Sequence, residues 1–298
     1  MSVAATKHGI SIQEKPVWRW GLLVFLTPPL LWLLLLIVLP HLDLFMLSLR
    51  EQTGEGQYGF TFRHYQRFFG EPIYWVTFAR TAMYSIVSTI LTFLVAFPVA
   101  FFLTKVVRLR LRGFLFVVLM LSFWVSELVR TYGWMILLRE SGVLNHLLIG
   151  MGVMDTRVEF LYNDASIMVG LIYNSMLFMV VPIFSVLDSM DDSYVEAAYD
   201  LGANSWTVIW RIVIPYAMPG IVSGSIMVFM LTLGNYLVPN LLGGKNSLWF
   251  TEQIYNQFIT RLNWEQGSAF GFLLLFLSSL IVWAGLKLSR QNLSKVVQ

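Results

Sequence analysis

Cysteine is missing from the 298 residues of this chain, and charged residues make up only 12% of it. Without cysteine there is no disulfide framework, no thiolate metal site and no cysteine nucleophile. An average soluble domain carries about 25% charged residues, so this composition argues against a soluble globular protein. The net charge of +3 is spread along the chain and forms no concentrated basic patch, which argues against nucleic-acid binding.

Motifs for nucleotide binding and catalysis are missing as well. No G-x-x-x-x-G-K-[ST] occurs, because the string Leu242-Gly243-Gly244-Lys245-Asn246 lacks both the upstream glycine and the hydroxyl. No H-E-x-x-H occurs, and the 4 histidines lie far apart in sequence. Ser223-Gly224-Ser225 lies in an apolar stretch, as in an intramembrane serine protease, but no intramembrane histidine accompanies it. We therefore expect no catalytic residue, metal site or cofactor in this chain.

Long apolar runs are abundant, since 57% of the residues are hydrophobic. A helix that crosses about 30 Å of hydrocarbon needs about 20 such residues. Six runs qualify and predict an all-α membrane protein: Gly21–Leu39, Thr81–Thr104, Gly113–Leu138, Ala165–Leu187, Ala217–Leu241 and Ser268–Leu288. The first run is too long for a signal peptide and no small-x-small cleavage site follows it, so we interpret it as an uncleaved signal anchor.

Basic residues near the ends of these runs predict the orientation in the membrane. They gather before the first run, between the second and third, and after the sixth: Lys7, Lys15, Arg19, Lys105, Arg108, Arg110, Arg112, Lys287, Arg290 and Lys295. With six spans these segments share one side, so both termini are expected in the cytoplasm. Residues 1–20 then form a cytoplasmic segment, and residues 21–298 form the transmembrane domain.

The segment between the fourth and fifth runs, about 188–216, has the pattern of a short helix-turn-helix. Asp191, Asp192 and Ser193 suit a helix start, and Gly202 permits the positive φ that ends a helix. Asn204 or Ser205 can cap a second helix, which Pro215 follows. Trp206, Ile209, Trp210 and Val213 are predicted to share one face of that helix. On these patterns alone, a surface hairpin that merely connects two spans remains an alternative.

A spacing pattern within this loop resembles a known family. Glu196-Ala197-Ala198, three residues, Gly202, nine residues and Ile212-Val213-Ile214-Pro215 are similar to the EAA loop of binding-protein-dependent ABC importer permeases. The chain departs from the family pattern only at Ile214, where leucine is usual. The loop also lies between the fourth and fifth of six spans, as in that family.

The resemblance implies the type I ABC importer permease fold, with five core helices plus an N-terminal span. It implies that the loop is a coupling helix that docks on a cytoplasmic ATPase subunit. Glu196 would pair with a basic or hydroxyl group there, Ala197 and Ala198 would allow close approach, and Gly202 would set the turn. Tyr199 and Leu201 would fill the ATPase groove, with Asp200 between them and Pro215 ending the segment.

The family also implies the partners of this chain. These are a second permease subunit (a homologue or a second copy), two ATPase subunits that hold ATP and Mg²⁺, and a periplasmic solute-binding protein. The chain itself would be a non-catalytic, multi-pass subunit in the bacterial inner membrane, surrounded by lipid.

Similarity outside the loop is greatest to the spermidine/putrescine-type branch. It covers nearly the whole chain and rests on Val129–Leu138, Gly142–Leu148, Tyr236–Gly244 and Asn263-Trp264. Permeases for opines, phosphonates and other small solutes share much of these strings. Polyamine-type members often carry acidic groups near the fifth span, where this chain has Asn235 and Asn240 instead. A polyamine is the expected solute, with those other solutes as alternatives.

Polar side chains within the predicted spans are the candidates for the solute path, since a charge in hydrocarbon is costly unless it faces a cavity or a partner. Glu127 suits a cationic solute, although Arg130 at i+3 could neutralise it locally. Asn174 and Asn235 are either path residues or interhelical hydrogen-bond donors. Tyr132, Trp134 and Tyr236 could stack on an ammonium group, or anchor the chain at the membrane interface.

A self-sufficient secondary transporter or channel is the rival class. The loop pattern argues against it, as does the absence of evident inverted repeats with interrupted helices.

Overall fold

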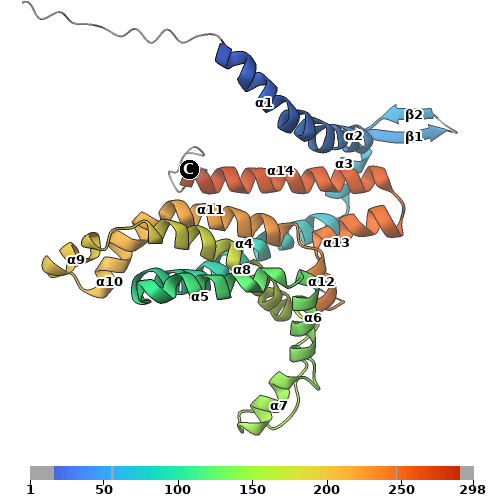
Figure 1. Ribbon diagram of the computed structural model, residues 1–298. Helices are drawn as coiled ribbons and strands as arrows, with labels where there is room; N and C mark the ends of the chain where they lie inside the picture. Colours follow the sequence, from blue (N-terminus) through green and yellow to red (C-terminus); the bar gives the residue numbers. More distant parts are fainter. Residues whose placement is uncertain (1–16, 55–56, 246, 289–298) are drawn as a thin grey trace, which may run out of the picture.

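The computed structural model describes residues 17–54, 57–245 and 247–288, which form a helical bundle with one small β-hairpin (Figure 1). The predicted segment 1–20 and the basic residues Arg290 and Lys295 lie largely or wholly outside this range. The first part of the chain contains α1 Val17–Leu33, a π-helical turn Leu34–Val38, α2 Leu39–Ser48, β1 Arg50–Gly54, β2 Gln57–Phe60, α3 Arg63–Gly70, α4 Pro72–Phe101 and a π-helical turn Phe102–Val106.

The remainder is helical. Its elements are α5 Leu109–Leu121, a 3₁₀ turn Ser122–Trp124, α6 Glu127–Leu138, α7 Val143–Gly150, α8 Asp164–Asp188, α9 Ser193–Asp200, α10 Ser205–Val208, a π-helical turn Ile209–Val213, α11 Ile214–Leu233, α12 Leu237–Leu242, α13 Phe250–Tyr255, a π-helical turn Asn256–Thr260 and α14 Trp264–Leu288. The strands pair antiparallel, with Arg50 opposite Phe60.

Five continuous helical stretches in the described part of the chain are long and apolar enough to cross a membrane: Gly21–Ser48, Pro72–Val106, Asp164–Asp188, Ser205–Leu233 and Trp264–Lys287. A bent pair of segments makes a sixth. The predicted all-α membrane fold is confirmed. The predicted first and second spans were too short, since both helices continue beyond the apolar runs that revealed them.

The predicted third span, Gly113–Leu138, is not one continuous helix. The chain turns by 89° between Leu109–Trp124 and Glu127–Gly150. Val125 and Ser126 adopt extended backbone conformations, and a new helix, α6, begins at Glu127. The carboxylate in this first turn complements the positive end of the helix. The apolar run does not reveal this break, because the two segments together are apolar enough to be one span.

The predicted fifth span, Ala217–Leu241, is wrong at its end. Helix α11 stops at Leu233, and residues 234–236 form a break before α12. Asn235 stabilises the restart, since its side chain accepts a hydrogen bond from the Val238 backbone N–H at 2.9 Å. The two residues predicted within one span, Asn235 and Tyr236, therefore lie in the turn between two helices.

The core of the bundle is the contact of α4, α8 and α11, which lie side by side in Figure 1. Small and aliphatic residues fill it, including the fully buried Ala96, Ala100, Met179 and Val213. Lipid-embedded helices gain little from the hydrophobic effect when they associate. Close packing of small residues is therefore an important contribution to the stability of the bundle. Gly220, which forms a G-x-x-x-G pattern with Gly224, shows this closeness: a Cβ at Gly220 would lie 2.6 Å from the Pro182 carbonyl oxygen.

We expect Gly220→Ala to destabilise the protein in detergent by about 1–3 kcal/mol, because the added methyl group must push α11 away from the α8 backbone. Gly271→Ala on α14 is the matched control, since a Cβ at Gly271 meets nothing within 4 Å. That control should be neutral or stabilised by about 0.5–1 kcal/mol, the usual cost of a helical glycine. Thermal unfolding of the two purified variants makes the comparison, and equal midpoints would contradict the proposed close contact.

Helix α1 leans away from the bundle, whereas α2 lies against α14 (Figure 1). No residue in the most apolar window of Gly21–Ser48 is buried. The N-terminal part of this span therefore presents its whole circumference to lipid or to another subunit.

Candidate functional site

The predicted helix-turn-helix is present at one end of the bundle, formed by α9 and α10 (Figure 1). Gly202 has φ of +80°, the left-handed conformation that the sequence predicted for it. Of the two predicted N-caps of the second helix, Asn204 is the one observed, since its side chain accepts a hydrogen bond from the Thr207 backbone N–H at 2.8 Å. At the start of α9, the Ser193 backbone N–H donates to Asp191 and holds the pKa of that carboxyl below its usual range.

The tip of this loop is apolar and exposed. Leu201 is 89% exposed, and Tyr199 beside it is about half exposed. Glu196, Ala197, Asp200, Gly202 and Pro215 are exposed too. Ala198 differs, because it is buried in the core of the bundle. Its small side chain therefore allows α9 to approach the spans, and it does not face a partner as the resemblance implied.

The predicted single face of Trp206, Ile209, Trp210 and Val213 is wrong. Trp206 and Trp210 are exposed and meet edge to face at 5.5 Å, whereas Val208 and Val213 are buried in the core. The π-helical turn Ile209–Val213 causes this difference, since its wider turn shifts the residues that follow relative to an α-helix.

Basic side chains of the α4–α5 turn hold the loop in place. Lys105 donates to the Met190 carbonyl and to Asp192, both at 2.6 Å, and its side chain is nearly buried. Arg112 pairs with Asp188 at 2.6 Å and also donates to the Thr104 carbonyl. From the sequence, these basic residues predicted only the orientation in the membrane. The carboxylates at residues 188–192 were the signal in the sequence that Lys105 and Arg112 also form ion pairs.

Glu127 and Asn235 meet inside the bundle. The Asn235 amide donates to Glu127 Oε1 at 2.7 Å, which joins the first turn of α6 to the break after α11. The Asn235 carbonyl also accepts from the Thr251 hydroxyl at 2.7 Å. Glu127 and Arg130 form no ion pair within the described chain, so the local pair considered from the sequence is absent.

A cavity of about 170 Å³ adjoins this contact, and four predicted path residues line it: Glu127, Arg130, Asn174 and Asn235. Asn174 donates to the Thr131 hydroxyl at 3.1 Å. Its carbonyl oxygen and the Arg130 Nε are buried, and neither has a hydrogen-bond partner in the described part of the protein. A cavity with unpaired donor and acceptor atoms suits a polar solute, since such atoms are costly to bury unpaired.

The three predicted aromatic residues lie outside this cavity. Tyr132 is exposed on α6, and Trp134 packs edge to face on Tyr173 at 5.5 Å. Tyr236 stacks on Tyr255 with ring centroids 4.4 Å apart, next to the Asn235 contact. Only Tyr236 is therefore close to the polar residues.

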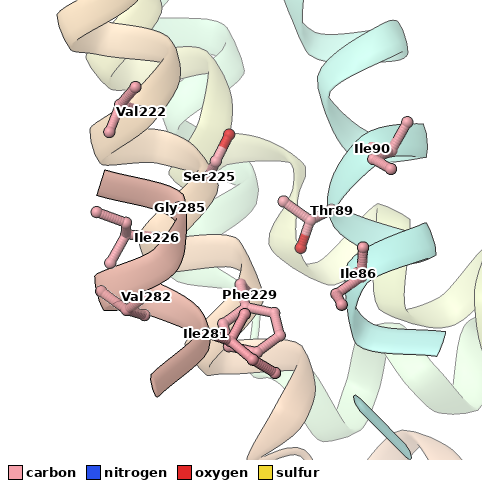
Figure 2. Close-up of a pocket in the computed structure, with 10 residues that line it drawn as sticks. All are labelled: Ile86, Thr89, Ile90, Val222, Ser225, Ile226, Phe229, Ile281, Val282 and Gly285. Carbon is pink, nitrogen blue, oxygen red and sulfur yellow. The ribbon is translucent and has the colours of Figure 1, made fainter. Parts of the chain in front are cut away.

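A second cleft lies between α4, α11 and α14 (Figure 2). Its lining is mostly aliphatic, and Thr89 and Ser225 supply its only polar side chains. A cleft without charged groups suits lipid better than a charged solute.

Asp164 at the start of α8 organises a polar cluster that the sequence did not reveal. Its carboxylate accepts from the Tyr84 and Ser247 hydroxyls at 2.7 and 2.8 Å and pairs with Arg80. Nearby, the Phe250 N–H donates to the Thr81 hydroxyl at 2.8 Å. These contacts fix the segment between α12 and α13, and so position Asn235 and Tyr236. Partners 80 or more residues apart leave no local pattern.

Comparison with known proteins agrees with this geometry. The family "Binding-protein-dependent transport system inner membrane component" matches residues 15–293. The spermidine/putrescine transport system permease protein PotB of Haemophilus influenzae is 32% identical over 85% of this chain and 88% of that protein. PotB of Escherichia coli K12 is 31% identical over 89% of this chain and 96% of that protein.

A solved bacterial ABC transporter involved in the import of alginate shares the fold. Its matching chain has a TM-score of 0.75 at 20% identity, over 93% of this chain and 99% of that chain. Because the family model and the PotB relatives both cover most of the sequence, the chain belongs to the inner-membrane components of binding-protein-dependent transport systems, and it is a type I ABC importer permease.

Proposed function

We propose that this chain is the membrane-spanning subunit of an ATP-driven importer for a polyamine such as spermidine or putrescine. The observation that carries the proposal is the similarity to spermidine/putrescine permeases over most of the chain. The Glu127 carboxylate at the edge of a polar cavity supports it, since a cationic solute needs an anionic partner inside the membrane.

The importer would contain a second permease subunit (a homologue or a second copy), two cytoplasmic ATPase subunits and a periplasmic solute-binding protein. ATP and Mg²⁺ would bind to the ATPase subunits. Both termini, the α4–α5 turn and the coupling loop would face the cytoplasm, with residues 1–20 as a cytoplasmic segment and residues 21–298 as the permease domain. The basic residues of the α4–α5 turn support this orientation.

The exposed coupling loop would transmit movement from the ATPase to the spans. Leu201 and Tyr199 would enter a groove on the ATPase, while Glu196 would pair with a polar group at its edge. The ion pairs of Lys105 and Arg112 make the loop rigid with respect to α4 and α5. Closure of the ATPase dimer on ATP would then shift the spans, open the path to the periplasm and admit solute. Hydrolysis would reset the path.

A different small solute is the second candidate, because Asn235 and Asn240 are neutral where polyamine-type members often carry acids. An opine or a phosphonate would use the same machinery with another binding protein.

Purification of the complex from native membranes in mild detergent tests both proposals. We expect an ATPase subunit with a nucleotide-binding motif to co-purify, and ATP hydrolysis to rise when polyamine-loaded binding protein is added. Stimulation only by an opine or a phosphonate would keep the importer and replace the solute. Recovery of this chain alone, without an ATPase, would favour a secondary transporter.

A further inference from the structure

Two segments meet at the end of the bundle opposite the coupling loop: the break at residues 234–236 and helix α13 (Figure 1). The Thr251 hydroxyl donates to the Asn235 carbonyl at 2.7 Å and fixes this contact. The rings of Tyr236 and Tyr255 stack with their planes 22° apart. Aromatic faces are negative at their centres, so a stacked pair beside an acidic group favours a cation nearby.

Glu252 is the acidic group. It follows Thr251 directly and is partly buried, and its carboxylate makes no hydrogen bond or ion pair with any residue in the described part of the chain. Burial raises its pKa above the usual value. Burial, the neighbouring Tyr255 and the charge of Glu252 also raise the pKa of Tyr236. Glu252 and Tyr255 are three residues apart on α13 and so share one face of that helix. A partly buried carboxylate without a partner is costly unless a cation joins it.

Hydrogen bonds connect Thr251, the residue before Glu252, with the inner carboxylate. Asn235 accepts from Thr251 through its backbone and donates to Glu127 through its side chain at 2.7 Å. Glu127 thus lies at one end of a short polar connection, and the start of α13, which carries Glu252, lies at the other. Neither carboxylate has an ion pair within the described residues.

We propose that Glu252, Tyr236 and Tyr255 form an outer ammonium site, and that this site and Glu127 together bind a solute with at least two cationic groups. The inference deepens the function proposed above and rests on it for the direction of movement. The outer site receives one ammonium group as the solute leaves the binding protein. Glu127 receives the other, so the solute is held at both ends within the path.

A charge-matching experiment tests the outer site in the reconstituted complex with saturating, solute-loaded binding protein. Initial uptake is measured for putrescine and for N-acetylputrescine, in which a neutral amide replaces one of the two ammonium groups. We expect Glu252→Gln to reduce putrescine uptake by about tenfold or more, since a charge-assisted contact is lost. The same change should reduce uptake of the acetylated solute several-fold less, because that solute lacks the second ammonium group that the outer site would bind.

Two further variants separate charge from packing. Tyr255→Phe keeps the aromatic ring and should lose less polyamine uptake than Tyr255→Leu, which removes the ring and should lose several-fold. Glu159→Gln is the matched control, since it removes an exposed carboxylate elsewhere in the chain and should leave uptake unchanged.

The outcomes separate this inference from the proposed function. Suppose that the wild-type complex takes up polyamines, and that Glu252→Gln loses uptake of both solutes equally or loses none. This result overturns the outer site and leaves the proposed function standing. If the wild-type complex takes up only a neutral or anionic solute, both the outer site and the proposed function are overturned. A charge-dependent loss with some other dicationic solute supports the site and corrects the identity of the solute.

Discussion

Gly202→Asp and Glu196→Lys are each expected to reduce ATP-driven uptake by roughly a hundredfold or more while the protein remains in the membrane. Each change puts an uncompensated charge, or the wrong charge, at an exposed loop that is proposed to dock on an ATPase. A charge left unpaired in an interface costs about 2–5 kcal/mol, and about 2.7 kcal/mol corresponds to a hundredfold change. Uptake into vesicles with matched amounts of the complex measures the effect.

Gly202→Asn is the matched control for the first of these variants. Asparagine and aspartate have nearly the same shape, and both tolerate the left-handed backbone conformation that Gly202 adopts. A Cβ at Gly202 meets nothing within 4 Å, so neither side chain clashes within this chain. We expect Gly202→Asn to retain more uptake than Gly202→Asp, because only the latter adds charge. Normal uptake by both Gly202→Asp and Glu196→Lys would refute the coupling assignment.

Glu127→Gln is expected to reduce uptake of a cationic solute by about tenfold to a hundredfold, the usual range for losing a hydrogen bond to a charged group. Glutamine keeps an oxygen that can accept from Asn235, so the contact between α6 and the break after α11 is retained. The loss of charge is then separated from a loss of structure. Uptake at saturating, loaded binding protein measures the first, and thermal unfolding checks the second.

Glu127→Leu completes this comparison, because it removes the charge and the acceptor together. It should lower the unfolding midpoint as well as uptake, since the Asn235 amide loses its partner. If Glu127→Gln transports normally and only Glu127→Leu fails, Glu127 holds the two segments together and does not bind solute.

The coupling loop shows how far local pattern alone can lead. The Glu196–Pro215 spacing, the positive φ of Gly202 and the cap at Asn204 all follow from residues within a few positions of one another, and the structure contains this helix-turn-helix. The predicted single face of the second helix was wrong, because a π-helical turn after Val208 changes the periodicity of the side chains. Ala198 was placed toward the partner, but it is buried because α9 lies against the spans.

The path residues show what local pattern misses. Glu127 and Asn235 were predicted from the sequence as path residues within two different spans, with pairing to Arg130 as the alternative role for Glu127. The 89° turn before α6 and the break after α11 bring the two side chains together from positions 108 apart in sequence. Glu252 and Tyr255 were not selected, because only this folding places them next to Tyr236.

The sequence by itself determined the apolar runs, the family and the coupling loop, because these depend on composition and on short spacings within one helix or turn. The tertiary structure decided where helices break, which carboxylates lack a partner and which basic residues hold the loop. Those features depend on contacts between distant segments, such as Asp164 with Tyr84 and Ser247. Such contacts are stable because polar groups of two segments pair with each other inside the membrane, where water does not satisfy them. The sequence of one segment alone does not show which partner it meets.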